Sequence, residues 1–154
     1  MIIPAAKEFI DKHPDAIFKC IIPTIPKGFY NRIIDELKPE DLGENLQLMH
    51  HLSFEELKKE ISCSHVVLIP SYSEGFCFAA VEARALNTAI ISSGNGALQE
   101  TVSGKHITME GFNKEALIKA LERAYHSDFD YSTPKDFDLD NSIHEYLSLY
   151  KKLQ

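Results

Sequence analysis

Apolar and polar residues follow two different periods along this chain. Continuous apolar runs, typical of strands that are buried on both faces, occur at residues 17–22, 46–49, 66–69, 89–92 and 106–109. Between these runs, apolar residues recur three and four positions apart, as on one face of a helix. This spacing predicts helices at residues 5–13, 29–37, 54–62, 78–86, 98–102 and 114–126. The sequence therefore predicts an α/β domain.

The order of these elements predicts how the domain is wound. Strands separated by helices of this length favour a Rossmann-like, doubly wound parallel sheet, which binds ligands at the carboxyl ends of its strands. The most continuous run, 66–69, is expected to be a central strand covered on both faces. The loop Pro70 to Gly75 follows it, so it lies at a ligand-binding end of the sheet.

The pattern changes after residue 126. Residues 1–126 are expected to form the Rossmann-like domain, whereas 127–141 are acidic and sparsely apolar and read as a linker. A helical pattern resumes at Ile143–Leu153, with Tyr146, Leu147 and Tyr150 on it. Residues 127–154 are therefore predicted to be an acidic linker and a C-terminal helix that packs on the domain or beyond it.

Composition limits the classes of partner. A chain of 154 residues with 44% hydrophobic residues can bury one core of its own. Its formal charge of -7 repels nucleic acid and anionic membranes, so neither is an expected partner. The apolar start Met1–Pro4 is soon interrupted by Lys7 and Glu8, so a signal peptide or membrane span is not expected and the predicted location is cytoplasmic.

The cysteines and histidines predict neither disulfides nor a metal site. Cys20, Cys63 and Cys77 are odd in number and lie far apart in apolar runs. Histidines and cysteines do not recur at the spacing of a zinc site. Ser53 and Glu56 form a capping box, which marks the start of a helix and is a structural signal.

The junction between the run 66–69 and the helix 78–86 carries the candidate chemistry. The first amides of this helix, near Gly75 to Cys77, lack intrahelical acceptors and lie at the positive end of the helix dipole. Such amides bind phosphate readily. Gly75 also allows a ligand to approach the backbone closely.

Two carboxylates flank this junction. Glu74 precedes the helix, and Glu82 lies inside it among small and apolar neighbours. An ionised carboxylate accepts hydrogen bonds, and its two oxygens match the paired hydroxyls of a sugar or a ribose. Glu82 is therefore expected to hold a ribose and Glu74 a transferred sugar. The alternative is a loop acid and a helix-surface acid with no ligand.

Neighbouring residues have structural alternatives. Phe76 and Phe78 could stack on a ligand, but aromatic residues beside a buried helix more often pack in the core. Cys77 is better interpreted as a packed thiol than as a nucleophile. Arg84 either lies on the surface, which is favoured, or pairs with Glu82.

The residues Glu74-x7-Glu82 with Glu74-Gly75-Phe76 resemble the Glu-x7-Glu signature of retaining GT-B glycosyltransferases of group 1, often numbered family 4. Residues 82–91 are similar to the family's Glu-Ala-x-Ala-x-Gly-x-Pro-Val-Ile, with Asn87 at the position of the helix-ending glycine; asparagine tolerates that left-handed cap. Residues 96–104 resemble a second family motif, although one glycine and a proline are replaced. The resemblance covers roughly residues 15–125.

The resemblance identifies the chain as similar to the C-terminal, donor-binding half of a GT-B enzyme. It implies that Glu74, Gly75, Phe76, Cys77 and Glu82 bind a UDP- or GDP-sugar, with Glu74 also catalytic, and that no metal or cofactor is needed. It also implies an N-terminal acceptor domain and a basic strand-loop, both absent from these residues. A fragment of a longer enzyme, a weakly binding diverged protein, and a half completed by another chain all stay open.

Two functions follow as expectations. The first is the donor-binding domain of a hexosyl-type glycosyltransferase, with retention implied by the resemblance. The alternative is a non-catalytic module of this fold that binds a protein partner or has a regulatory role. The Asp-x-Asp patterns at 128–130, 136–138 and 138–140 lie in an acidic tail, so they are interpreted as a solvated linker and not as a metal site.

Overall fold

The computed structural model describes residues 1–22 and 43–153. Its elements are α1 (Ile2–Lys12), β1 (Phe18–Ile22), the 3-10 turn η2 (Gly43–Asn45), β2 (Leu46–His50), α3 (Phe54–Cys63), β3 (Val66–Ile69), α4 (Phe78–Ala85), β4 (Ala89–Ser92), α5 (Leu98–Thr101), β5 (Gly104–Thr108), α6 (Lys114–Tyr125), β6 (Asp130–Ser132) and α7 (Leu139–Lys152). The predicted loop at 23–28 and helix at 29–37 lie outside the described residues. The other predicted helices and strands are confirmed, with shifted ends.

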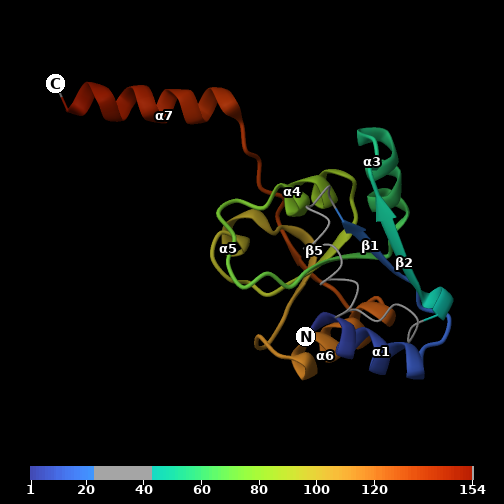
Figure 1. Cartoon of the computed structure of the whole chain (residues 1–154). Coiled ribbons are helices and arrows are strands. Elements are labelled where there is room, and N and C mark those ends of the chain that lie inside the picture. The colour runs from blue at the N-terminus through green and yellow to red at the C-terminus, as the bar shows by residue number, and fades with distance from the viewer. Residues whose placement is uncertain (23–42, 154) are drawn as a thin grey trace, which may run out of the picture.

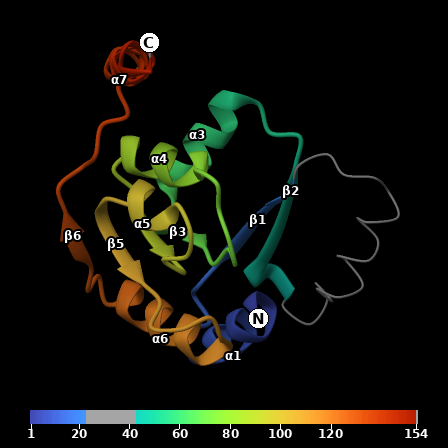
Figure 2. The same cartoon turned by 90° about the vertical axis from the view of Figure 1, so that its left-hand side faces the viewer.

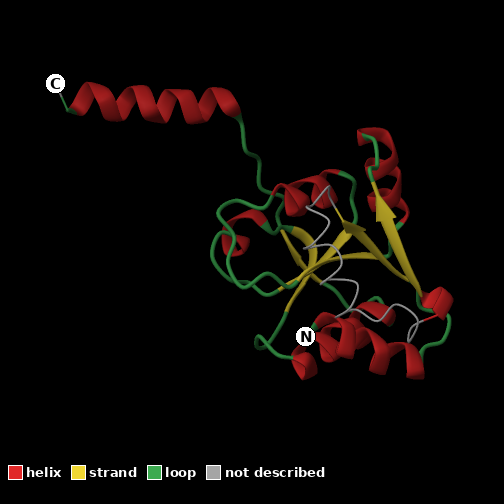
Figure 3. Cartoon of the chain, viewed as in Figure 1, coloured by secondary structure: helices red, strands yellow, loops and turns green. Residues whose placement is uncertain are grey.

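The strands form two sheets (Figure 1 and Figure 3). β1 pairs in parallel with β2, and β3, β4 and β5 form a second parallel set in that order. In Figure 2, α1 and α6 lie below the strands, whereas α3 and α4 lie above them. Helices on both faces of parallel strands confirm the doubly wound α/β class.

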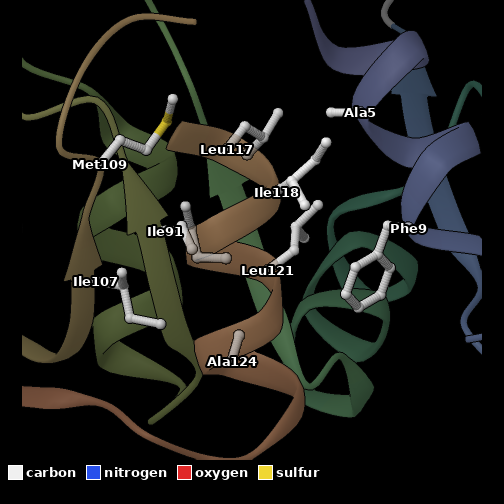
Figure 4. Close-up of a cluster of buried hydrophobic side chains, with 10 residues drawn as sticks. Ala5, Phe9, Ile91, Ile107, Met109, Leu117, Ile118, Leu121 and Ala124 are labelled. Atoms are coloured by element: carbon white, nitrogen blue, oxygen red, sulfur yellow. The ribbon is translucent and has the colours of Figure 1, made fainter. Parts of the chain in front are cut away.

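Each face of the strands has its own apolar core. On one face, α1 and α6 cover the sheet through Ala5, Phe9, Leu117, Ile118 and Leu121, which surround Ile91 and Ile107 (Figure 4). Phe18 of β1 and Val66 and Leu68 of β3 pack against the same cluster. One helical layer therefore supports strands of both sheets.

The opposite face is covered by α3, α4 and α5. Its core contains Ile61, Ala80, Ala83, Ile90 and Leu98, with Val67 packed against it and Ile69 buried in it. Val66 and Leu68 face one helical layer while Val67 and Ile69 face the other, as the period of two requires. This two-sided burial explains why the strands read as continuous apolar runs.

Local signals fix the helix ends as the sequence predicts. The backbone N–H of Ser53 donates to Glu56 Oε2 at 2.7 Å and the Glu56 N–H donates back to Ser53 Oγ, which confirms the capping box. Asn87 takes φ +57° after α4, and the N–H groups of Asn87 and Thr88 donate to carbonyls of the last turn of α4. Asparagine therefore ends α4 in the left-handed conformation that glycine usually supplies.

Three features differ from the sequence prediction. Residues 130–132, expected in an acidic linker, form β6, which pairs antiparallel with β5. The last helix begins at Leu139, earlier than predicted, because Asp138 caps it. β3, expected to be a central strand, is paired with β4 alone among the described strands, although both of its faces pack against helical layers.

Helix α7 stands away from the rest of the structure (Figure 1), and none of its residues is buried. Its exposed apolar side chains include Leu139, Ile143, Tyr146, Leu147 and Tyr150. Among the described residues, no helix has both the length and the apolar character needed to cross a bilayer.

Candidate functional site

The loops that follow β3, β4 and β5 meet at the carboxyl edge of the sheet. The loop after β3 runs from Pro70 to Cys77 and leads into α4. The loop after β4 is tied to it, because Ser93 Oγ donates to the Ser71 carbonyl at 2.6 Å and the Ser93 amide donates to the Ile69 carbonyl at 3.2 Å. These bonds hold the two loops in one surface.

Gly96 brings the two sequence motifs into contact. Its φ is +57°, and a Cβ at this position would lie 2.8 Å from the Glu74 carbonyl oxygen. The amide of Ala97 also donates to that carbonyl at 3.1 Å. Any side chain at residue 96 would push the Glu74 loop away, so this glycine is needed to position Glu74.

The N-terminus of α4 presents free backbone donors. Cys77 is its N-cap and takes φ 73° and ψ 77°, an uncommon conformation for a residue other than glycine. Among the described residues, the amides of Gly75, Phe76 and Cys77 have no hydrogen-bond acceptor. These donors lie at the positive end of the helix dipole, where anions bind.

Glu74 precedes these amides in the chain, and Glu82 follows them inside α4. Both residues are half-buried, and within the described part of the chain neither carboxylate has a hydrogen bond or an ion pair. Both carboxylates act electrostatically on the thiol of Cys77, so they share one neighbourhood. Half-buried carboxylates without partners are costly, which favours an external ligand.

The thiol of Cys77 is not set up as a nucleophile. Burial raises its pKa, and the nearby charges of Glu74 and Glu82 raise it further, although the amides of Ala80 and Ala79 oppose this. A nucleophilic cysteine needs a lowered pKa, because the thiolate is the reactive form. Cys77 also packs against the core under α4, so its side chain is structural, as the sequence favours.

Gly75 has no structural reason to be glycine. Its φ is not positive, and a Cβ added to it would meet nothing within 4 Å. The space that a side chain would occupy here is therefore open. This contrasts with Gly96, which the fold itself requires.

The aromatic residues divide into two groups. Phe78, for which core packing was favoured, is 73% exposed, and that prediction is wrong. Phe76 is half-buried and lies edge-on to Phe78 and to Phe137 of the tail, with ring centroids 5.1 Å apart in each pair. The tail leading to α7 therefore passes beside the site.

Tyr72 and Phe112 form a second aromatic pair that the sequence reasoning missed. Their rings meet edge-on at 5.4 Å, and their side chains project from the loops after β3 and β5. Tyr72 is 77% exposed, which is unusual for a large aromatic residue without a partner surface. The signal available in the sequence was the position of each residue just after a predicted strand.

Arg84 does not match either sequence interpretation. It is half-buried instead of lying on the surface, and it makes no ion pair with Glu82 in the described structure. Its Nε is buried without a hydrogen-bond partner, and its Cγ lies 3.6 Å from the Cβ position of Gly104. The arginine stem therefore packs across the start of β5.

The acidic tail has structural partners. Arg123 Nε donates to Asp128 Oδ2 at 2.8 Å, and Arg123 also pairs with Asp130 at 3.2 Å, while Asp138 caps α7. Within residues 1–22 and 43–153, three or more potential metal ligands do not cluster at any point. Asp128, Asp130 and Asp138 therefore have structural roles at the end of α6 and the start of α7.

A cavity of about 440 Å³ lies at the opposite ends of the strands from the candidate site. It is lined by residues at the amino ends of the strands, among them His65, Thr88, Lys105 and Tyr131. It includes neither Glu74 nor Glu82. Because the free amides and unpaired carboxylates lie at the carboxyl edge, we place the candidate site there and not in the cavity.

The carboxyl-edge surface can bind a ligand with two kinds of polar group. Its amides can donate to an anion, and its carboxylates can accept hydrogen bonds from hydroxyl groups on either side of that anion. In this loop, residues 70–77, there is no lysine or arginine. This loop therefore supplies uncharged backbone donors and the carboxylate of Glu74, but no positive side chain of its own.

Comparison with known proteins shows the family of this chain. A family model described as glycosyl transferases group 1 matches residues 26–140. The chain is 29% identical over 108 residues to a D-inositol 3-phosphate glycosyltransferase of Corynebacterium kroppenstedtii, covering 66% of this chain and 24% of that protein. It is 40% identical over 77 residues to an MMP alpha-(1->4)-mannosyltransferase of Mycolicibacterium hassiacum, covering 50% and 18%.

Solved structures show the same fold. The sucrose-phosphate synthase of Thermosynechococcus elongatus superposes with a TM-score of 0.69 at 24% identity, over 82% of this chain and 33% of that one. The pneumococcal O-GlcNAc transferase GtfA, solved with UDP and GlcNAc, gives a TM-score of 0.62 at 21% identity, covering 82% and 26%. The chain thus spans about a quarter to a third of these proteins. On the matched motifs and fold, it belongs to the glycosyl transferases of group 1 and corresponds to a C-terminal domain of the GT-B type.

Proposed function

We propose that this chain is the donor-binding domain of a glycosyltransferase that transfers a hexose from a UDP- or GDP-sugar, with retention of configuration. The observation that carries the proposal is the pair of unpartnered, half-buried carboxylates, Glu74 and Glu82, around the free amides at the start of α4. A nucleotide sugar has a diphosphate between two hydroxyl-bearing rings, which is the arrangement this surface matches.

Each residue then has a separate role. The amides of Gly75, Phe76 and Cys77 bind diphosphate oxygens, and Gly75 leaves room for them. Glu82 accepts hydrogen bonds from the ribose hydroxyls, and Glu74 accepts them from the transferred sugar. Glu74 is the catalytic residue because it lies against the ring from which the diphosphate departs.

Transfer requires more than this surface provides. Negative charge builds on the departing diphosphate in the transition state, and preorganised positive groups lower its energy. The loop 70–77 has backbone amides and hydroxyl groups as donors for this charge, but no lysine or arginine. Completion by an acceptor-binding domain, in the same or another polypeptide, is therefore part of the proposal. The proposed chemistry uses no metal ion or other cofactor.

Calorimetric titration of the full chain with UDP, GDP and their glucose, mannose and N-acetylglucosamine conjugates tests the binding step. We expect binding to wild type and a loss of at least about tenfold in affinity for Glu82→Ala, since removing a charged hydrogen-bond partner costs about 1.5–3 kcal/mol. Glu115→Ala is the control, because this carboxylate lies on α6 and its side chain is 75% exposed.

Comparing Glu74→Ala with Glu82→Ala separates the two roles. Glu74→Ala is expected to weaken binding of the sugar conjugates but to leave binding of free UDP or GDP unchanged, whereas Glu82→Ala weakens both. Equal affinity of all three proteins would contradict the assignment of either carboxylate to the donor.

A non-catalytic module that binds a protein partner is the second candidate. The observation that favours it is α7, whose apolar residues are exposed along a helix with no buried residue. If wild type binds none of the nucleotides or conjugates at millimolar concentration while remaining folded, this second function becomes the better explanation.

A further inference from the structure

The tail between β6 and α7 is tied to the domain by two hydrogen bonds. The backbone N–H of Lys135 donates to Ser103 Oγ at 3.1 Å, and Lys135 Nζ donates to the Gln99 carbonyl at 3.1 Å. Gln99 lies in α5, and Ser103, which is buried, lies between α5 and β5. The tail is therefore held against the segment that leads from α5 into β5.

Phe137 lies two residues further along the tail and contacts the start of α4. Its ring meets the ring of Phe76 edge-on, with the centroids 5.1 Å apart and the planes at 77°. Phe76 also lies edge-on to Phe78, but Phe78 is two positions away on the same segment and is 73% exposed. In Figure 1 the chain that leads from β6 to α7 passes beside α4. Phe137 is thus the ring that a distant part of the chain places against Phe76.

The backbone next to Phe76 is the strained part of the candidate site. Cys77 has φ 73° and ψ 77°. A residue other than glycine keeps such a conformation only where its surroundings hold it there. The thiol of Cys77 packs against the core under α4, and the ring of Phe76 contacts Phe137. Two neighbouring side chains therefore anchor the peptide unit that joins Phe76 to Cys77.

The same tail is connected to Glu74 through α5. Ala97, the N-cap of α5, donates its amide to the Glu74 carbonyl at 3.1 Å. Lys135 of the tail binds the Gln99 carbonyl in that helix. The loop from Glu74 to Cys77 is therefore held at its beginning by α5 and near its end by Phe137. Both contacts belong to one connected set of segments, which consists of α5, the tail and the start of α4.

We propose that Phe137 is a positioning residue of the donor site. Its ring holds the side chain of Phe76 and thereby fixes the amides of residues 75–77 in the arrangement that binds the diphosphate of the nucleotide sugar. Phe137 acts through Phe76 and does not itself contact the ligand. The inference rests on the proposed donor function, and it makes the tail beyond β6 a part of the donor site.

Preorganisation of the amides is the physical reason for an effect on affinity. Backbone donors that already have the geometry of the bound state lose less conformational freedom when the ligand binds. Without the ring of Phe137, Phe76 loses its contact with the tail, and Cys77 is free to leave the left-handed region. The turn must then be formed again each time a diphosphate binds, and this cost lowers the affinity.

Cysteine labelling of the full chain without nucleotide tests the positioning step. The thiol of Cys77 is half-buried and burial raises its pKa, so it reacts slowly while the turn keeps its conformation. We expect Phe137→Ala to raise the rate at which N-ethylmaleimide modifies Cys77 at least about threefold, as measured by mass spectrometry. Cys63, which is exposed, is the internal control and should react at the same rate in both proteins. An unchanged rate at Cys77 would overturn the proposal.

Calorimetric titration with UDP and GDP tests the effect on the donor site. We expect Phe137→Ala to weaken binding of the nucleotide that wild type binds by at least about fivefold, and Phe137→Tyr, which keeps the ring, to retain the wild-type affinity. Leu139→Ala is the control, because this side chain is two residues further along the chain and is 71% exposed. An equal loss of affinity in Leu139→Ala would assign the effect to α7 and would overturn the proposal.

A double variant shows whether Phe137 acts through Phe76. If it does, Phe137→Ala has no further effect on nucleotide affinity in a protein that already carries Phe76→Ala, so the two losses are not additive. Additive losses would mean that Phe137 affects the site by another route, which contradicts the proposal. Because Phe137 is 40% exposed and lies in the tail, all of these variants should remain folded, and thermal denaturation checks this.

Failure of the donor function has a different signature from failure of this inference. If wild type binds neither UDP nor GDP but Phe137→Ala still raises the labelling rate of Cys77, the donor function is wrong and the positioning of the turn by Phe137 is supported. If wild type binds a nucleotide and Phe137→Ala binds it equally well, Phe137 does not position the donor site, and the proposal is overturned while the donor function stands.

Discussion

Helices α6 and α7 have similar lengths and similar apolar spacing but opposite surroundings. α6 has 12 residues and buries Leu117, Ile118, Ala120, Leu121 and Ala124, whereas α7 has 14 residues and buries none. In Figure 1, α6 lies beside α1, while α7 projects away from the body. An amphipathic pattern therefore shows that a helix has an apolar face. Whether another part of the domain packs against that face depends on the rest of the fold.

The ends of the two helices also differ in how far they contact the rest of the domain. Asn113 caps α6, Lys114 Nζ lies 3.1 Å from Glu8 of α1, and Arg123 ties the last turn to the residues around β6. α7 has its own cap at Asp138 but packs no buried side chain on the domain. α6 is thus joined to the domain at both ends and along its length, and α7 through the preceding tail.

The largest effect on the free energy of unfolding is expected when one leucine from each helix is replaced by alanine. Leu117→Ala should lower the free energy of unfolding by about 2–5 kcal/mol, because it leaves a cavity in a fully buried cluster. Leu147→Ala, at a side chain that is 52% exposed, should change it by less than about 0.5 kcal/mol. Urea denaturation of both variants checks this. A similar loss in both would mean that α7 is packed in solution.

The helix caps give a smaller contrast. Asn113→Ala removes the acceptor for the Ala116 amide, at 2.8 Å, and should lower the free energy of global unfolding by about 1 kcal/mol. Asp138→Ala should leave global unfolding unchanged and reduce only the helix signal of α7 in circular dichroism. Equal shifts of the urea midpoint would show that the two helices unfold together.

Acid should weaken the contact at the end of α6 that Arg123 makes with Asp128. Hydrogen bonding and charge from Arg123 lower the pKa of Asp128 below its ordinary value of 3.8. The stability from this pair is therefore complete above pH 3.8 and is lost as the pH falls through the lowered pKa.

Arg123→Gln tests this. The difference in melting temperature between wild type and Arg123→Gln should be small at neutral pH, because the pair is exposed, and should vanish in strong acid. A difference that persists after Asp128 is protonated would assign the effect to packing of the arginine stem. Lys151→Gln in α7 is the control and should show no difference at any pH.

Deletion of residues 139–154 is expected to have the smallest effect. Because α7 buries no side chain, the melting temperature of the domain should stay within about 1 °C of wild type, while the helix signal falls. The ring contact of Phe76 with Phe137 is retained in this deletion. A large drop in melting temperature would contradict the exposed position of α7.

Much of the site was predictable because it depends on local sequence. Glu74, Gly75 and Glu82 follow from a strand, a turn and a helix that are contiguous in the chain, and Asn87 supplies the expected left-handed cap. The contact of Gly96 with the Glu74 carbonyl was not predictable, because it joins two loops that separate strands bring together. Tyr72 and Phe112 were missed for the same reason.

By itself, the sequence determined the alternation of strands and helices, the helix ends, and the junction that carries the two carboxylates. These features depend on residue period and on caps within a few positions. Only the tertiary structure showed that β6 pairs antiparallel with β5, that β3 pairs with β4 alone among the described strands, and that no residue of α7 is buried. The spacing of apolar residues shows which face of a helix or strand is apolar. Packing between segments that are distant in the sequence decides which neighbour covers that face.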